Sequence, residues 1–187
     1  HYVRQGEPLG LGHAVLCAAR HVGDQRFAVL LGDDLIDARD PLLPTMLDVQ
    51  RRHGGSVIGL IEVDPEKTHL YGCAAIAGDP ASGVVDVTDL VEKPEPGEAP
   101  SNLAIIGRYV LDPAVFDALR DTKPGRGGEI QLTDALKTLI TTPAEKGGGM
   151  RAVVFRGRRY DTGDRVVYLR TTVGLGGERA GFGPECR

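Results

Sequence analysis

The first regular pattern of apolar positions follows the stretch GEPLGLG. Leu11, Ala14, Val15 and Ala18 recur at i, i+3, i+4 and i+7, the spacing of one face of an amphipathic helix. The next apolar stretch, RFAVLLGDD, is continuous rather than periodic and ends in two aspartates. A short continuous apolar run is typical of a strand that is buried on both faces. The pattern therefore predicts a helix and then a buried strand.

The same order repeats before the pattern changes. PLLPTMLDVQRRHGG has helical spacing and ends in glycines, and SVIGLIEV is rich in β-branched residues, which favours a strand. From Tyr71 onward, YGCAAIAG, VVDVTDLVEKP and LAIIGRYVLD are strand candidates joined by glycine, proline and serine turns. Little helix separates these three stretches, which indicates an insertion or an antiparallel extension.

Helices return in the last third of the chain. PAVFDALRD has Pro113 in a plausible first turn, and EIQLTDALKTLI has a weaker helical pattern. RAVVFRG predicts a last strand, GRRYDTGD a polar turn, and DRVVYLRTTV a closing helix that Asp164 caps. The glycine-rich residues 174–187 are expected to be a poorly ordered tail. We thus expect one domain over residues 1–173, and a tail over 174–187.

Together these elements predict an α/β fold. We expect a Rossmann-like mixed, mainly parallel sheet with helices on both faces and a small antiparallel extension. In such sheets ligands bind beyond the carboxyl ends of the strands. The polar residues at predicted strand ends are therefore the first candidates for function.

Composition narrows the class of protein. With 187 residues, 41% of them hydrophobic, the chain is long enough for one domain with a sizeable core. A net charge of -4 and scattered basic residues argue against a nucleic-acid-binding surface. No apolar run is long enough to span a membrane, so we expect a cytoplasmic protein without a membrane partner. Three cysteines without CxxC spacing predict neither a disulfide framework nor a zinc site.

Two acidic stretches are candidates for metal binding. Asp33 and Asp34 follow a predicted strand, and Asp161 lies in RYDTGD, held in a turn by Gly163. Mg²⁺ prefers one or two carboxylates together with phosphate oxygens and water. The alternative for each stretch is local: a capping role for the doublet and an Asx turn for Asp161.

Two further stretches are candidates for ligand binding. Gly10 and Gly12 precede a predicted helix and would let the backbone approach a flat or anionic group; the alternative is a simple helix-entry turn. Glu92 and Lys93 end a predicted strand just before a proline. We interpret Glu92 as an acceptor for sugar hydroxyls and Lys93 as a point charge for a phosphate on the same ligand. The alternative is a solvated strand edge on which the lysine prevents aggregation.

Taken together, these motifs form a recognisable set. QGEPLGLGHAV, VLLGDDLID, YGCAAI, VEKPEPGEAPSNLAIIGRYVL, GGEIQLTDAL and YDTGD occur in this order. From about Tyr2 to about Leu169 the chain resembles the bacterial-type UTP-glucose-1-phosphate uridylyltransferases, also called UDP-glucose pyrophosphorylases, within the sugar-phosphate nucleotidyltransferases. The resemblance implies that UTP and glucose 1-phosphate are converted to UDP-glucose and pyrophosphate, with Mg²⁺ as cofactor. It also implies a homo-oligomer.

On the nucleotide side, the resemblance implies roles for four residues. Gln5 and Gly12 resemble the family's uracil-contacting positions. Asp33 resembles its metal-binding aspartate, and Asp161 its second metal ligand.

The resemblance also implies a sugar site. Gly72 resembles a backbone contact to the hexose, Glu92 the residue that binds the sugar hydroxyls, and Lys93 the catalytic lysine at the sugar phosphate. Asn102 and Val110 lie in the matching strand and are expected to shape the sugar pocket.

The chain departs from the family pattern at its beginning. The family's glycine-rich signature would lie ahead of His1, so we expect this chain to be a piece of a longer protein and to be weakly active or inactive by itself. Three alternatives stay open: a related nucleotidyltransferase that uses dTTP, a glycosyltransferase that shares an acidic metal motif, and a non-catalytic module that binds sugar nucleotides.

Overall fold

The computed structural model describes residues 1–178 and 181 and divides into two compact units. The first unit comprises residues 1–29 and 42–156, and the second comprises residues 30–41 and 157–187 so far as they are described. The helices are α1 (Leu11–Cys17), α2 (Ala19–Val22), α3 (Leu42–His53), α4 (Val115–Asp121), α5 (Leu132–Thr141) and α6 (Arg165–Glu178). The short 3-10 helices are η1 (Pro65–Leu70), η2 (Pro80–Ser82), η3 (Arg126–Gly128) and η4 (Ala144–Lys146). The strands are β1 (Phe27–Leu30), β2 (Asp34–Ile36), β3 (Ser56–Glu62), β4 (Gly72–Ala77), β5 (Val84–Glu92), β6 (Leu103–Leu111), β7 (Met150–Val154) and β8 (Arg159–Asp161).

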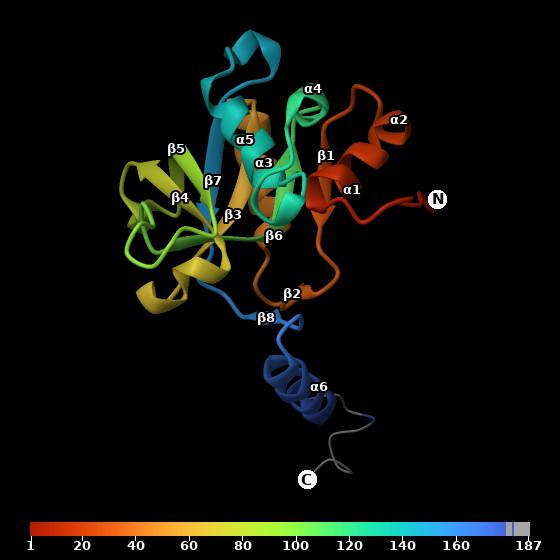
Figure 1. The fold of residues 1–187 in the computed structure, drawn as a ribbon. Coiled ribbons are helices and arrows are strands. Elements are labelled where there is room, and N and C mark those ends of the chain that lie inside the picture. Colours follow the sequence, from red (N-terminus) through yellow and green to blue (C-terminus); the bar gives the residue numbers. More distant parts are fainter. Residues whose placement is uncertain (179–180, 182–187) are drawn as a thin grey trace. The chain divides into compact units, whose positions relative to one another are not determined.

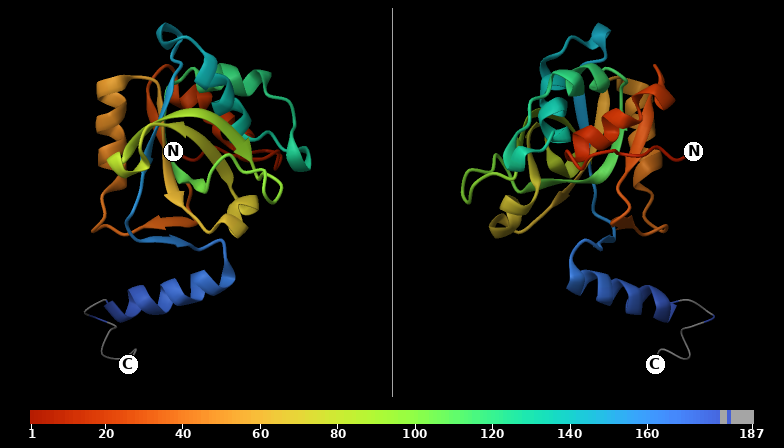
Figure 2. Two further views of the ribbon diagram at one scale, coloured as in Figure 1. Left: turned by 90° about the vertical axis from the view of Figure 1, so that its left-hand side faces the viewer. Right: turned by 45° about the vertical axis from the view of Figure 1, so that its right-hand side comes forward.

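A six-stranded sheet forms the centre of the first unit (Figure 1). Its strand order is β1-β6-β3-β7-β5-β4, and β4 also pairs with β6 through Cys73 and Ala104. Figure 2 shows α3 on one face of this sheet, and α1, α4 and α5 on the other face. The mixed α/β fold with helices on both faces, as predicted from the sequence, is confirmed.

Strand direction differs in part from the expectation of a mainly parallel sheet. β3 and β7 are parallel, whereas β3 with β6, β4 with β5, β4 with β6 and β5 with β7 are antiparallel. All nine residues of β6 are buried. A strand buried on both faces has a continuous apolar pattern whether it runs parallel or antiparallel to its neighbours, so the sequence pattern did not reveal the direction of β6. The antiparallel strands β5 and β4 extend this sheet at one edge, because β5 pairs directly with β7, whereas β6 lies inside the sheet between β1 and β3.

The hydrophobic core lies in the first unit. Among the described residues, every buried apolar side chain falls between Val15 and Phe155 and outside residues 30–41. Met46 of α3, Leu119 of α4 and Leu136 of α5 are at most 1% exposed, so each of these helices places an apolar face on the sheet. The strands that carry the candidate site residues are thus held on both faces.

The second unit contains a two-stranded sheet and one helix. β2 pairs with β8 in antiparallel register, so that Asp34 lies opposite Asp161.

Asp164 caps α6 as predicted, because its Oδ1 accepts hydrogen bonds from the backbone N–H groups of Val166 and Val167, each at 2.9 Å. α6 continues to Glu178, so residues 174–178, which the sequence interpretation placed in a glycine-rich tail, are helical. Residues 179, 180 and 182–187 lie outside the described part of the chain. No helix in the described part of the chain is long and apolar enough to cross a membrane.

Candidate functional site

The end of β5 holds Glu92 and Lys93 on a defined backbone. Glu92 is the last residue of the strand and pairs with Gly72 of β4, and the Lys93 N–H donates to the Tyr71 carbonyl at 3.0 Å. Lys93 has a φ of +44°, and among the described residues no other non-glycine has a positive φ. This backbone conformation is uncommon for a side-chain-bearing residue and often marks a functional position. The charged pair therefore lies at a sharply turned strand end.

The Glu92 carboxylate is oriented by two neighbours. The Thr133 hydroxyl, at the start of α5, donates a hydrogen bond of 2.6 Å to Glu92 Oε2. The other oxygen, Oε1, lies 3.9 Å from the Lys93 ammonium nitrogen. The Glu92 side chain is 15% exposed, whereas that of Lys93 is 46% exposed. Glu92 is thus a largely enclosed acceptor beside a more exposed cation.

Gly72 leaves room for this arrangement. A Cβ atom at residue 72 would lie 3.0 Å from Glu92 Oε2 and 3.2 Å from the Thr133 hydroxyl, closer than ordinary contact. The next residue, Cys73, is fully buried, and this burial, with a smaller contribution from the Glu92 charge, raises the pKa of the Cys73 thiol. Cys73 is therefore a packed thiol and not a nucleophile.

The predicted nucleotide-side glycines are engaged in packing. The Gly12 N–H donates to the Ile130 carbonyl and the Ile130 N–H donates to the Leu9 carbonyl, both at 2.8 Å. A Cβ at Gly12 would lie 2.6 Å from the Ile130 carbonyl oxygen. Gly12 is therefore needed for a close approach to the segment before α5, and its N–H is already used. Gln5 lies nearby in sequence, and its Nε2 contacts the Gly10 carbonyl and His13 Nδ1, each at 3.1 Å.

Asn102 and Val110 occupy different environments. The Asn102 side chain donates to Glu62 Oε1 at 3.0 Å and borders a cavity of about 270 Å³. That cavity is lined by Pro65, Thr68, Gly97, Ala99, Ser101 and Asn102. Val110 is 1% exposed and pairs with Val57 within the sheet. In this structure Val110 is a core residue.

In the second unit, Asp33 and Asp161 converge on Gly163. Asp33 Oδ2 and Asp161 Oδ1 lie 3.3 and 3.2 Å from the point where a Cβ of residue 163 would be. The Asp33 carbonyl also accepts hydrogen bonds from the N–H and the hydroxyl of Thr162, both at 2.7 Å. Two carboxylates from segments more than a hundred residues apart therefore share one small space. No cluster of three or more acidic, histidine or cysteine side chains that could hold a metal was found among the described residues.

The aspartate doublet divides into two roles. Asp33 is exposed, whereas Asp34 is 4% exposed and accepts from Arg159 Nε at 2.8 Å. The same guanidinium donates from Nη2 to Asp161 Oδ2 at 3.2 Å. Arg159 thus neutralises the buried Asp34 and holds Asp161 in place, so Asp34 is structural, and Asp33 is the accessible carboxylate of the doublet.

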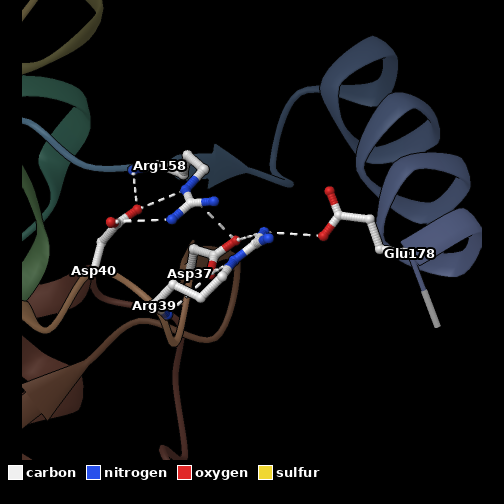
Figure 3. Close-up of polar contacts among 5 residues, drawn as sticks. All are labelled: Asp37, Arg39, Asp40, Arg158 and Glu178. Atoms are coloured by element: carbon white, nitrogen blue, oxygen red, sulfur yellow. Dashed lines mark hydrogen bonds and ion pairs between the residues drawn. The ribbon is translucent and has the colours of Figure 1, made fainter. Parts of the chain in front are cut away.

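A second group of charges in this unit is committed to ion pairs (Figure 3). The Arg39 side chain makes two hydrogen bonds to Asp37, at 2.6 and 2.8 Å, and the Arg158 side chain makes two to Asp40, at 2.7 and 3.1 Å. Arg39 also contacts Glu178 at 2.9 Å. The hydrogen bonds from Arg39 hold the pKa of the Asp37 carboxyl well below its usual range, and those from Arg158 lower the pKa of Asp40. These carboxylates are therefore poor candidates for a metal.

Five of the nine predicted site residues thus form two groups, one in each unit, whereas Gln5, Gly12, Asn102 and Val110 lie outside both groups. Gly72, Glu92 and Lys93 meet at the end of the β4–β5 pair, and Asp33 and Asp161 meet at Gly163. Sequence reasoning missed two further residues, Thr133 and Arg159. Thr133 lies within GGEIQLTDAL, where only the motif as a whole stood out, and Arg159 lies two residues before Asp161 on a three-residue strand. A strand of three residues is too short to show an alternation of apolar and polar residues. The pairing of this strand with β2, which brings Arg159 to Asp34, was therefore not predictable from the sequence.

Known proteins resemble the chain over nearly all of its length. The family model described as nucleotidyl transferase matches residues 1–172. The UTP-glucose-1-phosphate uridylyltransferase YngB of Bacillus subtilis is 44% identical over 176 residues, which is 94% of this chain. The chain spans 57% of the length of that relative.

Solved structures agree with this relationship. A UDP-glucose pyrophosphorylase complexed with UDP-glucose superposes with a TM-score of 0.87 and 39% identity, covering 96% of this chain and 66% of that one. A UTP-bound UGPase from Acinetobacter baumannii gives a TM-score of 0.82 and 36% identity, covering 98% of this chain and 62% of that one. The matched family model, the similar folds and the shared motifs together place this chain in the nucleotidyl transferase family.

Proposed function

We propose that this chain forms part of a UTP-glucose-1-phosphate uridylyltransferase, which joins UTP and glucose 1-phosphate to give UDP-glucose and pyrophosphate. The observation that carries the proposal is the 44% identity to a relative of that name across 94% of the chain. The cytoplasmic location and a homo-oligomeric state belong to the same proposal.

The sugar end of the substrate is assigned to the β4–β5 strand end. Glu92 accepts hydrogen bonds from sugar hydroxyls, since its enclosed carboxylate has acceptor capacity beyond the one bond from Thr133. Lys93 meets the sugar phosphate, because its more exposed ammonium group is a compact point charge beside that carboxylate. Gly72 contributes a backbone contact to the hexose, and Asn102 contributes to the pocket wall. For Val110 we propose an indirect effect on pocket shape through packing.

The uracil is assigned to Gln5 and the neighbouring Gly12. Both contacts of the Gln5 amide described above use Nε2, so Oε1 is the atom that we assign to the imide N–H of uracil. Gly12 contributes indirectly, because its N–H donates to the Ile130 carbonyl and this hydrogen bond fixes the turn that contains Gly10. The Gly10 carbonyl in turn accepts the hydrogen bond from Gln5 Nε2.

A divalent cation, for which we propose Mg²⁺, is assigned to Asp33 and Asp161. Their oxygens converge on Gly163, which has no side chain to occupy the space between them, and a hard cation suits one or two carboxylates plus phosphate oxygens and water. When bound, such a cation neutralises phosphate charge and orients the leaving pyrophosphate. Arg159 supports the site by holding one oxygen of Asp161.

The reaction is a displacement at phosphorus. A phosphate oxygen of glucose 1-phosphate attacks the α-phosphorus of UTP, a new P–O bond forms, and the bond from the α-phosphorus to pyrophosphate breaks. No covalent enzyme intermediate is needed, so the residues act by positioning the substrates and by offsetting charge. Lys93 reduces the repulsion between the two anions as they approach.

The direct test is to assay pyrophosphate release by the complete gene product with Mg²⁺. UTP, dTTP and ATP are each paired with glucose, galactose and N-acetylglucosamine 1-phosphates. We expect release to be greatest with UTP and glucose 1-phosphate. A preference for dTTP would identify a thymidylyltransferase instead, and no release with any pair would favour a non-catalytic sugar-nucleotide-binding module.

Lys93→Ala should lower kcat/KM by about a hundredfold, the usual effect of losing one preorganised electrostatic contact of about 3 kcal/mol. Lys137→Ala is the matched control, because Lys137 is a surface lysine paired with Asp89 at 2.7 Å. Steady-state kinetics of both variants check this prediction. Near-wild-type turnover in Lys93→Ala would refute the role given to the lysine.

Asp33→Asn should raise the Mg²⁺ concentration needed for half-maximal activity by at least about tenfold. Loss of a residue that only supports a metal ligand typically lowers metal affinity by about tenfold or more, so loss of a ligand itself should have at least that effect. Asp48→Asn, which changes an exposed aspartate on α3 paired with Arg51, should leave the required Mg²⁺ concentration unchanged. Titration of activity with Mg²⁺ after removal of metal by a chelator measures the effect. Equal Mg²⁺ requirements in the two variants would remove Asp33 from the metal site.

A further inference from the structure

The Glu92 carboxylate depends on a hydroxyl from another part of the chain. Thr133 Oγ1 lies 2.6 Å from Glu92 Oε2, although the two residues are 41 positions apart. Hydrogen bonds to an ionised acceptor are shorter and stronger than those between neutral groups, and this distance lies in the charge-assisted range. Thr133 is 9% exposed, so water has little access to its side of the carboxylate.

Thr133 is itself held rigidly. It is the second residue of α5, and its neighbours Leu132 and Leu136 are at most 2% exposed in the core. Three residues earlier, Ile130 exchanges two backbone hydrogen bonds with the Leu9–Gly12 turn. The hydroxyl is therefore fixed both by the helix it begins and by the segment that leads into it.

The opposite side of the hydrogen bond is closed by backbone. Gly72 lies across the strand pair from Glu92, and its missing Cβ would approach both partners of the hydrogen bond. Glu92 Oε2 therefore lies between Gly72 and Thr133, whereas Oε1 lies on the side of Lys93. One oxygen is held by the protein, and the other faces the exposed cation.

We propose that Thr133 is a positioning residue for sugar recognition, which by fixing Glu92 Oε2 leaves Oε1 aimed at the hydroxyls of the sugar phosphate. The inference rests on the proposed function and deepens its sugar site. Without the hydroxyl, the carboxylate rotates toward Lys93, because an ammonium group 3.9 Å away becomes its strongest nearby partner. The sugar would then lose its acceptor while the uracil-side contacts stay intact.

The test uses Thr133→Val in the complete gene product, since valine keeps the branched shape and removes the hydroxyl. We expect the KM for glucose 1-phosphate and the Kd for UDP-glucose to rise about tenfold, as for a lost hydrogen bond to a charged group. The KM for UTP and the Kd for UMP should change less than about twofold, because the hydrogen bond lost from the Thr133 hydroxyl is the one to Glu92 on the sugar side. Thr133→Ser keeps the hydroxyl and should restore wild-type values. Thr133→Ala tests the same loss without a β-branched side chain, should valine impair folding.

Thr138→Val is the matched control. Thr138 lies on the same helix and its hydroxyl bonds the Asp134 carbonyl at 3.4 Å, so the same chemical change there should leave both constants unchanged. In a Glu92→Gln background, Thr133→Val should add no further effect, which a general loss of stability would not reproduce. Equal KM values for glucose 1-phosphate in wild type and both Thr133→Val and Thr133→Ala would overturn the inference, as would a parallel rise of the KM for UTP. Absence of UDP-glucose formation by the wild type would instead overturn the proposed function, and with it this inference.

Discussion

The candidate site depends on the pairing of Gly72 with Glu92 where β4 and β5 end. This register places glycine, which has no side chain, opposite the Glu92 carboxylate. The Thr133 hydroxyl donates a hydrogen bond of 2.6 Å to Glu92 Oε2 and so encloses the carboxylate further. A one-residue slip would turn Glu92 to the other face of the sheet, because the side chains of a strand alternate. The buried residues of the two strands oppose such a slip, since it would move Cys73 and Ala74 of β4, or Val85, Val87 and Leu90 of β5, out of the core. The core thus determines where a single carboxylate points.

The distribution of charge supports the same conclusion. The chain carries a net charge of -4, whereas the substrates we propose are themselves anions, so attraction must come from local groups and not from the overall field. In the second unit, arginines neutralise Asp34, Asp37 and Asp40. Asp33 stays exposed, and Asp161 turns one oxygen to Arg159 and the other to the space at Gly163. In both units, several charged side chains are therefore neutralised by ion pairs within the protein. A few carboxylates, such as Glu92 and Asp161, are held by one oxygen, while the other oxygen can still accept from a ligand.

The sequence was informative where the signal was local. The helices that begin after Gly10 and at Leu42, the strand that ends in Glu92, and the Asp164 cap all have short-range patterns, and the structure contains them. Strand direction, the three-residue strands β2 and β8, and the extension of α6 to Glu178 were not predictable in this way. They depend on contacts between distant segments or on glycines tolerated in a helix. The same limit applies to Thr133 and Arg159, whose partners lie 41 and 125 positions away.

We propose that the sugar phosphate binds at the end of the β4–β5 pair. The most direct measurement is a crystal structure of the complete gene product with UDP-glucose bound. We predict that Glu92 Oε1 lies within about 3.2 Å of a glucose hydroxyl and that the Lys93 ammonium group contacts the phosphate on the sugar side, both within ordinary hydrogen-bond reach. Glucose bound away from both residues, with the Glu92–Thr133 hydrogen bond unchanged, would contradict the account and make this strand end a purely structural feature.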